Sequence, residues 1–312
     1  MIKRWFILFL ICGGLTACTS FSSERNHKED DLPKPKNVIE KVIEKNIPSI
    51  PSEPLKMAKE PKNFLLIGVD SRREGNSRSD TIMLARYEPV NKKIKLVSLM
   101  RDSYVKIPIH PLTYSKLNHA YSLGGKDLLK QTVEQNFGVT IDHIAVIDFK
   151  GFISIMNTIA PDGLEVEVSQ AMIDDMNLSV KPGKQKLHGE ELLSFVRFRH
   201  DEMSDFGRVN RQQEVLISLK DQAIKQFATI DGIAKFPEMI KHTMHYVETD
   251  LKFDDAFSLG ASFLLNPVND VQTLRVPISN SFENKQYRHA GSVLQLDFME
   301  NEEAIKDFLH EK

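Results

Sequence analysis

The run Phe64–Val69 (FLLIGV) is the strongest constraint on the fold. An uninterrupted apolar stretch of this length is typical of a β-strand buried on both faces. Residues 81–87 and 94–100 are also rich in strand-forming residues, and a turn at 88–93 separates them. Further strands are expected at 143–149, 164–168, 195–200 and 271–276. A sheet built from such strands needs helices to cover it.

Segments with helical spacing alternate with these strands. They are expected at 125–137, 151–159, 190–193, 208–227, 233–246 and 253–265. The alternation predicts an α/β sandwich whose sheet is covered on both faces. The 312 residues allow two domains at most, and 41% hydrophobic residues suffice for a proper core. The net charge of −2 argues against a nucleic-acid-binding protein that relies on bulk positive charge.

The N-terminus has the layout of a bacterial lipoprotein signal. Residues 1–17 contain two cationic residues, an apolar run and then small residues, and Cys18 follows. The apolar run is shorter than the ~20 residues that a membrane-spanning helix needs. We therefore predict cleavage before Cys18 and lipidation of its thiol. An uncleaved signal anchor, or a cysteine placed there by chance, is the alternative.

Beyond the signal, the composition divides the chain into a tether and a folded domain. Residues 18–62 are rich in Ser, Pro, Lys and Glu and are predicted to form a flexible spacer. Residues 63–312 are predicted to form a single catalytic domain, with a core at 63–225 and a helical part at 226–312. These features predict a lipid-anchored domain on the extracytoplasmic face of the cell membrane.

Aspartates and arginines gather where three predicted strands begin or end. Asp70 and Arg72 follow the first strand, Arg78 and Asp80 open the second, and Arg101 and Asp102 end the third. One such residue alone is usually part of a turn or a helix cap. Three strand ends with the same pairing indicate a functional site, since strand ends in α/β sheets commonly carry one.

The rest of the arginine pattern repeats this chemistry. Eight of the 13 arginines fall within residues 72–78, 101 and 197–211. At a strand period of two, Arg197 and Arg199 point the same way, which is favourable if a multivalent anion lies between them. The alternative is an exposed edge strand that charge protects from aggregation. Three further polar residues lie on one face of the helix that follows: Arg208, Arg211 and Gln212.

These residue types suit phosphate chemistry. Guanidinium groups are planar, bidentate and always charged, so they match phosphate oxygens well. Asp70 and Asp80 are the best metal-binding candidates, and oxygen ligands without Cys favour Mg²⁺, or Mn²⁺, over zinc. No nucleotide-binding glycine motif occurs, which disfavours a nucleoside triphosphate.

Six motifs in order resemble the LytR–CpsA–Psr family of bacterial envelope proteins: FLLIGVDSR, RSDT, SLMRDSYVKIP, KLNHAYSLGG, VIDFKGF and FVRFRHDEMSDFGRVNRQQ. The resemblance implies a three-layer α/β/α sandwich with a central mixed sheet. It also implies transfer of an anionic glycopolymer, such as teichoic acid or capsule, from a polyprenyl-pyrophosphate carrier to peptidoglycan. Mg²⁺ is the implied cofactor, and an apolar tunnel is expected to hold the lipid.

The resemblance assigns roles to matching positions. Asp70 and Asp80 are expected to hold the metal, and Arg101, Asp102 and Asp205 to form the catalytic group. The expected pyrophosphate ligands are Arg72, Arg78, Arg101, Arg197, Arg199, Arg208, Arg211 and Gln212. The base that deprotonates the acceptor hydroxyl stays open among Asp102, Asp205 and an arginine. Two other functions stay open, namely a lipid pyrophosphatase and a non-catalytic lipoprotein that binds polyprenyl phosphates.

Overall fold

A computed structural model describes residues 57–70, 78–109, 111 and 113–310. The strands are β1 (Lys62–Val69), β2 (Ser79–Glu88), β3 (Lys93–Leu99), β4 (Tyr104–Ile107), β5 (Thr113–Lys116), β6 (His143–Asp148), β7 (Leu164–Val168), β8 (Gly183–Leu187), β9 (Val247–Thr249), β10 (Asp270–Val276), β11 (Phe282–Tyr287) and β12 (Gly291–Leu296). The helices are α2 (Leu117–Phe137), α3 (Phe149–Ile159), α4 (Gln170–Met176), α5 (Gly189–Arg197), α6 (Ser204–Phe227), α7 (Ile230–His245), α8 (Phe253–Leu265) and α9 (Phe298–His310).

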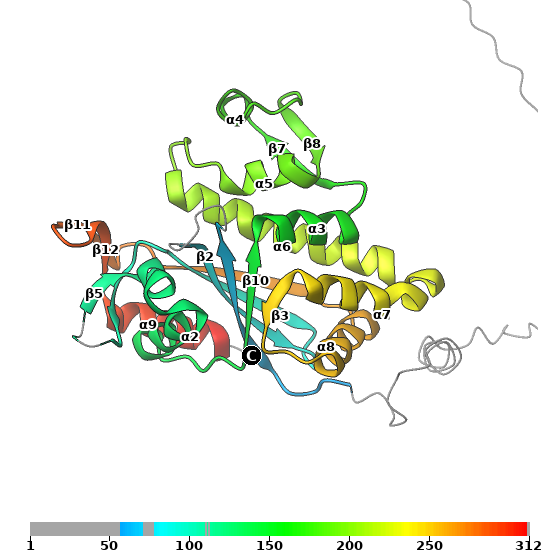
Figure 1. The fold of residues 1–312 in the computed structure, drawn as a ribbon, viewed down its shortest axis with the longest axis horizontal. Helices are drawn as coiled ribbons and strands as arrows, with labels where there is room; N and C mark the ends of the chain where they lie inside the picture. The colour runs from blue at the N-terminus through cyan, green and yellow to red at the C-terminus, as the bar shows by residue number, and fades with distance from the viewer. Residues whose placement is uncertain (1–56, 71–77, 110, 112, 311–312) are drawn as a thin grey trace, which may run out of the picture.

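A mixed six-stranded sheet in the order β10-β3-β2-β1-β6-β9 forms the centre of the fold (Figure 1). β2 is antiparallel to both of its neighbours, β1 and β3, so these two strands run in the same direction. The carboxyl ends of β1 and β3 therefore lie at the same sheet edge as the start of β2. This edge brings together the three strand ends that carry aspartate and arginine.

Helices cover both faces of the sheet, and they confirm the predicted three-layer α/β/α sandwich. On one face, α2 and α9 pack with the central strands around a core that includes Leu65, Leu129 and Ile305. On the other face, α3, α5 and α6 form a second core with the β7–β8 hairpin (Figure 1). α7 and α8 pack beside the end of α6 through an aromatic cluster at Phe227 and Phe236.

Strand β1 shows how the apolar run is used. Its alternate residues Leu65, Ile67 and Val69 are buried in the core under α2 and α9. Leu66 and Gly68 lie on the opposite face and are half-buried, because they line an apolar cavity. The predicted strand is confirmed, but only one of its faces packs in a core, and the other face borders a cavity.

The predicted strand at 195–200 is wrong. Phe195 belongs to the last turns of α5, which ends at Arg197, and residues 198–200 are irregular. Leu192, Leu193, Phe195 and Val196 are all buried, and this spacing fits one face of a helix. A short apolar run is ambiguous between strand and helix, and here the helical register continues from upstream.

Two helices begin at least four residues earlier than predicted. α2 begins at Leu117 and contains a kink at Gly124 and Gly125, where the backbone is not helical. It ends, as predicted, before Gly138, which has a left-handed φ of 63°. α6 begins at Ser204, so Arg208 lies in its second turn.

The predicted signal peptide, Cys18 and nearly all of the predicted tether lie outside the described residues. Within the part of the chain that the structure does describe, no helix combines the length and the apolar composition needed to cross a membrane.

Candidate anion-binding site and adjoining apolar cavity

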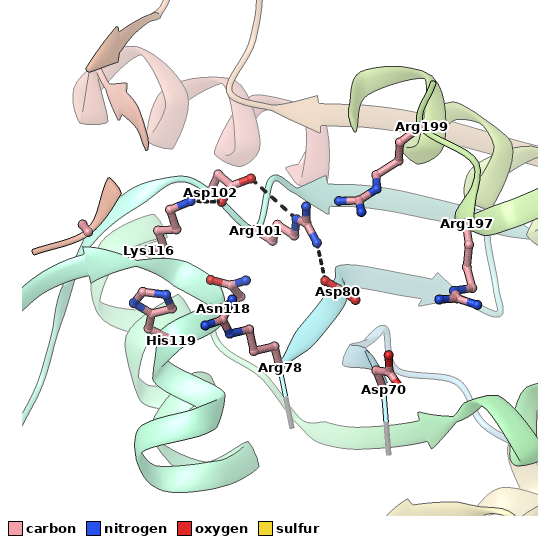
Figure 2. Close-up of a pocket in the computed structure, with 11 residues that line it drawn as sticks. Asp70, Arg78, Asp80, Arg101, Asp102, Lys116, Asn118, His119, Arg197 and Arg199 are labelled. Carbon is pink, nitrogen blue, oxygen red and sulfur yellow. Dashed lines mark hydrogen bonds and ion pairs between the residues drawn. The ribbon is translucent and has the colours of Figure 1, made fainter. Parts of the chain in front are cut away.

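A polar cavity of about 590 Å³ lies at the sheet edge where β1 and β3 end and β2 begins. Asp70 follows β1, Arg78 and Asp80 flank the start of β2, and Arg101 and Asp102 follow β3. The walls of the cavity are formed by Asp70, Arg78, Asp80, Arg101, Asp102, Lys116, Asn118, His119, Arg197, Arg199 and Ala290 (Figure 2). Five cationic side chains and three carboxylates thus line one cavity, which suits a multivalent anion.

Arg101 is held by carboxylates on three sides. It makes an ion pair with Asp80 (Figure 2), and its Nε and Nη2 atoms lie 3.5 and 3.6 Å from oxygens of Asp102 and Asp205. Burial acts to lower the pKa of Arg101, but the three carboxylates outweigh burial and raise that pKa above its ordinary value. This fixed guanidinium is charged at every relevant pH and is oriented before any ligand binds.

Arg208 is the most buried arginine of the site, with 4% of its surface exposed. Its two Nη atoms each lie 3.0 Å from a different oxygen of Asp205, and Nη2 also donates to the main-chain oxygen of Asp80. Burial lowers the pKa of Arg208 to about 10, although Asp205 opposes the shift. Asp205 therefore accounts for a cation near the start of α6, where the helix dipole is unfavourable.

Arg197 and Arg199 come from the end of α5 and the irregular segment after it. Both line the same cavity, as expected. They do so from a helix end and the residues after it, however, and not because they alternate along a strand. The guanidinium of Arg197 lies 4.4 Å from the ring centre of Phe149, a cation–π contact. Arg199 makes no ion pair with any carboxylate that the structure describes, so its charge is available to a ligand.

Arg211 and Gln212 do not line the polar cavity. Arg211 binds Asp201 and the main-chain oxygen of Phe198, both at 2.6 Å, so it anchors the segment that carries Arg199. Gln212 donates to the main-chain oxygen of Val196 at 3.4 Å and lines the apolar cavity instead. Arg208 also lines the apolar cavity and not the polar one. The structure thus separates these three residues from the other predicted anion ligands that it describes.

The apolar cavity, of about 320 Å³, lies between the sheet and the helices α3, α5 and α6. Leu66 and Met83 of the sheet face Phe152, Leu193 and other apolar side chains across it. Asp80, Arg197 and Arg199 line both cavities. The two spaces therefore adjoin at the arginine-rich end of the polar cavity.

Three residues on the opposite side of the polar cavity were missed as functional candidates: Lys116, Asn118 and His119. They lie within four consecutive residues at the junction of β5 and α2 (Figure 2). Lys116 donates to Asp102 at 2.6 Å, and Asn118 is buried with its side-chain oxygen unpartnered among the described residues. All three residues belong to the motif KLNHAYSLGG, which supported the family resemblance, but the sequence alone assigned no role to the polar residues of this motif.

Asp70 and Asp80 line the same cavity, but no group of three or more His, Cys, Asp or Glu side chains in the described residues forms a metal cage. Two carboxylates still fit Mg²⁺, which commonly binds one or two carboxylates together with substrate phosphates and water. Arg72 and Cys18 lie outside the described residues, so their predicted roles stay predictions.

The sandwich fold thus carries a polar, arginine-lined cavity beside an apolar cavity. The LytR_cpsA_psr family model matches residues 17–305, and the chain belongs to this family. It is 39% identical to the regulatory protein MsrR of Staphylococcus aureus over 80% of this chain and 74% of that protein.

Three further relatives bear on the function and the fold. The chain is 30% identical to the polyisoprenyl-teichoic acid–peptidoglycan teichoic acid transferase TagU of Bacillus cereus, over 86% of this chain and 84% of that one. Its fold matches the crystal structure of B. subtilis TagV, with a TM-score of 0.65 and 27% identity over 81% of this chain and 98% of that chain. It also matches TagT bound to LIIa-WTA, with a TM-score of 0.64 and 24% identity over 83% and 94% of the two chains.

Proposed function

We propose that this protein transfers an anionic glycopolymer, such as teichoic acid or capsule, from a polyprenyl-pyrophosphate carrier to peptidoglycan. The observation that carries the proposal is the junction of the two cavities at Asp80, Arg197 and Arg199. A lipid pyrophosphate has an apolar tail joined to a multivalent anion, and the two cavities offer these two environments side by side. The relationship to TagU supports the same class of donor and acceptor.

The apolar cavity suits the lipid tail near its phosphate. Its walls are mainly aliphatic and aromatic side chains of the sheet and of helices α3, α5 and α6. Burying the tail removes apolar surface from water, at roughly 25 cal/mol per Å². The phosphate next to the tail then lies at the shared boundary, within reach of Arg197 and Arg199.

The arginines then have distinct tasks. Arg101 is held by carboxylates before the donor binds, so it offers the phosphates a fixed, charged donor group at little cost in side-chain entropy. Arg78 and Arg199 make no ion pair with the described residues and can close on the bound anion. Neutralising the phosphates stabilises the charge that develops on the leaving polyprenyl phosphate.

Asp70 and Asp80 are the proposed ligands of Mg²⁺, with Mn²⁺ as a substitute. When bound, the metal supplies charge neutralisation at the phosphate oxygens. Asp80 would then contact both the metal and Arg101.

The proposed location is the extracytoplasmic face of the cell membrane, with a lipid anchor at Cys18. The support is the sequence pattern of residues 1–18. Such an anchor holds the domain close to the membrane in which its lipid donor resides.

A transfer assay tests the proposal. The purified domain is incubated with a polyprenyl-pyrophosphate oligosaccharide, peptidoglycan fragments and Mg²⁺, and the glycan joined to peptidoglycan is measured. Arg101→Ala is expected to lower the rate by about 100-fold or more. Arg86→Ala is the matched control, because it removes a guanidinium that pairs with Glu88 near the opposite end of β2. If wild type forms no more product than Arg101→Ala, the proposal is wrong.

A further inference from the structure

His119 occupies a distinctive place in the polar cavity. It lies in the first turn of α2 and is half-buried. Figure 2 shows it with Lys116 and Asn118 on one side of the cavity, whereas Arg197 and Arg199 lie on the other side. Since Arg197 and Arg199 also line the apolar cavity, His119 lies at the end of the polar cavity remote from the proposed lipid tail.

This position matters because of the geometry of phosphoryl transfer. The attacking and the leaving oxygen lie roughly in line on opposite sides of the phosphorus. The leaving group in the proposed reaction is the polyprenyl phosphate, which departs toward Arg197 and Arg199. The acceptor hydroxyl must therefore approach from the side that carries His119.

The carboxylates of the cavity are already engaged. Asp102 accepts a hydrogen bond from Lys116 at 2.6 Å and lies beside Arg101, and Asp80 is ion-paired with Arg101. Asp70 is the proposed partner of Asp80 in holding the metal. Each of these carboxylates thus already has a cationic partner or a proposed metal to bind.

The imidazole of His119 is oriented by a neighbour. Its Nδ1 atom lies 2.7 Å from the hydroxyl oxygen of Ser115, which is buried. A neutral imidazole has one donor and one acceptor nitrogen. When Nδ1 donates its hydrogen to Ser115, Nε2 carries the lone pair that can accept a proton.

The surroundings of His119 keep it neutral. Burial lowers its pKa, and the positive charges of Arg78, from the start of β2, and Lys116, from the end of β5, lower it further; Asp102, after β3, opposes them. The ring is therefore unprotonated at neutral pH and ready to accept a proton. Bound phosphates add negative charge nearby, which raises the basicity of the ring once the donor is in place.

We propose that His119 is the general base for the acceptor hydroxyl, an assignment that rests on the proposed function. The acceptor oxygen forms a bond to the phosphorus that bears the glycan. The bond from this phosphorus to the bridging oxygen breaks, and its electron pair leaves with the polyprenyl phosphate. The hydroxyl proton passes to Nε2 of His119, which afterwards releases it to water or to the departing phosphate.

Substitution of His119 tests the assignment. His119→Gln is expected to lower kcat by about 100- to 10,000-fold while leaving binding of the lipid donor unchanged within about twofold. In wild type, kcat/KM is expected to fall at acidic pH because His119 becomes protonated, and this fall is expected at a lower pH than for an ordinary histidine, since burial, Arg78 and Lys116 lower its pKa. This acidic limb is expected to disappear in His119→Gln, which a purely structural role cannot explain. Added imidazole is expected to restore part of the rate of His119→Ala.

His200→Gln is the matched control, because this histidine is exposed and its ring faces Asp175 instead of the cavity. It should keep both the wild-type rate and the acidic limb. A fully active His119→Gln, or one that keeps the acidic limb, overturns the assignment while the proposed function stands. A wild-type protein that transfers no glycan at any pH refutes the proposed function and this assignment with it.

Discussion

Removing the carboxylate of Asp205 should reveal how strongly the site depends on internal charge balance. Arg208 has 5% of its side chain exposed, and Asp205 contacts both of its Nη atoms at 3.0 Å. In Asp205→Asn the guanidinium stays buried without its bidentate partner. Breaking a buried ion pair from one side costs about 3–5 kcal/mol. We expect about 3 kcal/mol, since 16% of Asp205 is exposed and Asp80 still accepts a hydrogen bond from Arg208.

Thermal and urea unfolding measure this effect. For a domain of this size, 1 kcal/mol corresponds to roughly 2–4 °C, so Tm should fall by about 6–12 °C. The double variant Asp205→Asn with Arg208→Met should be more stable than Asp205→Asn alone, because it removes the unpaired charge. Glu165→Gln, which disrupts an exposed pair with Lys184, serves as control and should change stability by less than about 0.5 kcal/mol. An Asp205→Asn protein as stable as this control would refute the reasoning.

Three further predictions follow from the same structure. Asp80→Asn should raise the Mg²⁺ concentration for half-maximal transfer by at least about tenfold, as measured by metal titration; an unchanged midpoint argues against a metal at this carboxylate. Ala145→Phe, which fills the apolar cavity, should weaken binding of a polyprenyl donor but not of inorganic pyrophosphate, as calorimetry can show; equal loss for both ligands contradicts the assigned cavity. Burial acts to raise the pKa of Asp142, but hydrogen bonds from Asn63 and Lys62 outweigh it and lower the pKa. The carboxylate is thus more acidic when folded, so its stabilisation is present above pH ~4 and is lost as the pH falls through the folded-state pKa. Asp142→Asn should therefore flatten the loss of stability in acid, and an unchanged pH dependence refutes this.

Much of the fold could be predicted because long apolar and amphipathic segments leave little choice. Strand β1, the β2–β3 pair and helix α6 follow directly from their side-chain periodicity. The short hairpins and helix α9 were not predicted, because a few residues of weak pattern are stabilised mainly by contacts with distant parts of the chain. At residues 195–200 the alternation looked like a strand, but burial of Val196 and Phe195 on one helix face decided the structure.

The candidate site, too, could be predicted only in part from the sequence. Asp70, Asp80 and Arg101 could be placed together because strand ends of one sheet meet at one edge. Arg211 looked equivalent to Arg208 by helical spacing, yet only the packed structure shows that it is committed to Asp201 and Phe198. His119 was missed because its importance depends on which side of the cavity it faces, and periodicity carries no such information.

Product analysis tests the central claim most directly. The protein is incubated with a polyprenyl-pyrophosphate oligosaccharide and Mg²⁺, with and without peptidoglycan, and all products are identified by mass spectrometry. We predict phosphoglycan bonded to peptidoglycan and an equal amount of polyprenyl monophosphate, both formed only when peptidoglycan is present. Release of polyprenyl phosphate at the same rate without peptidoglycan indicates a pyrophosphatase. Recovery of the intact lipid donor from the protein under both conditions indicates a binding protein, and either result contradicts the account.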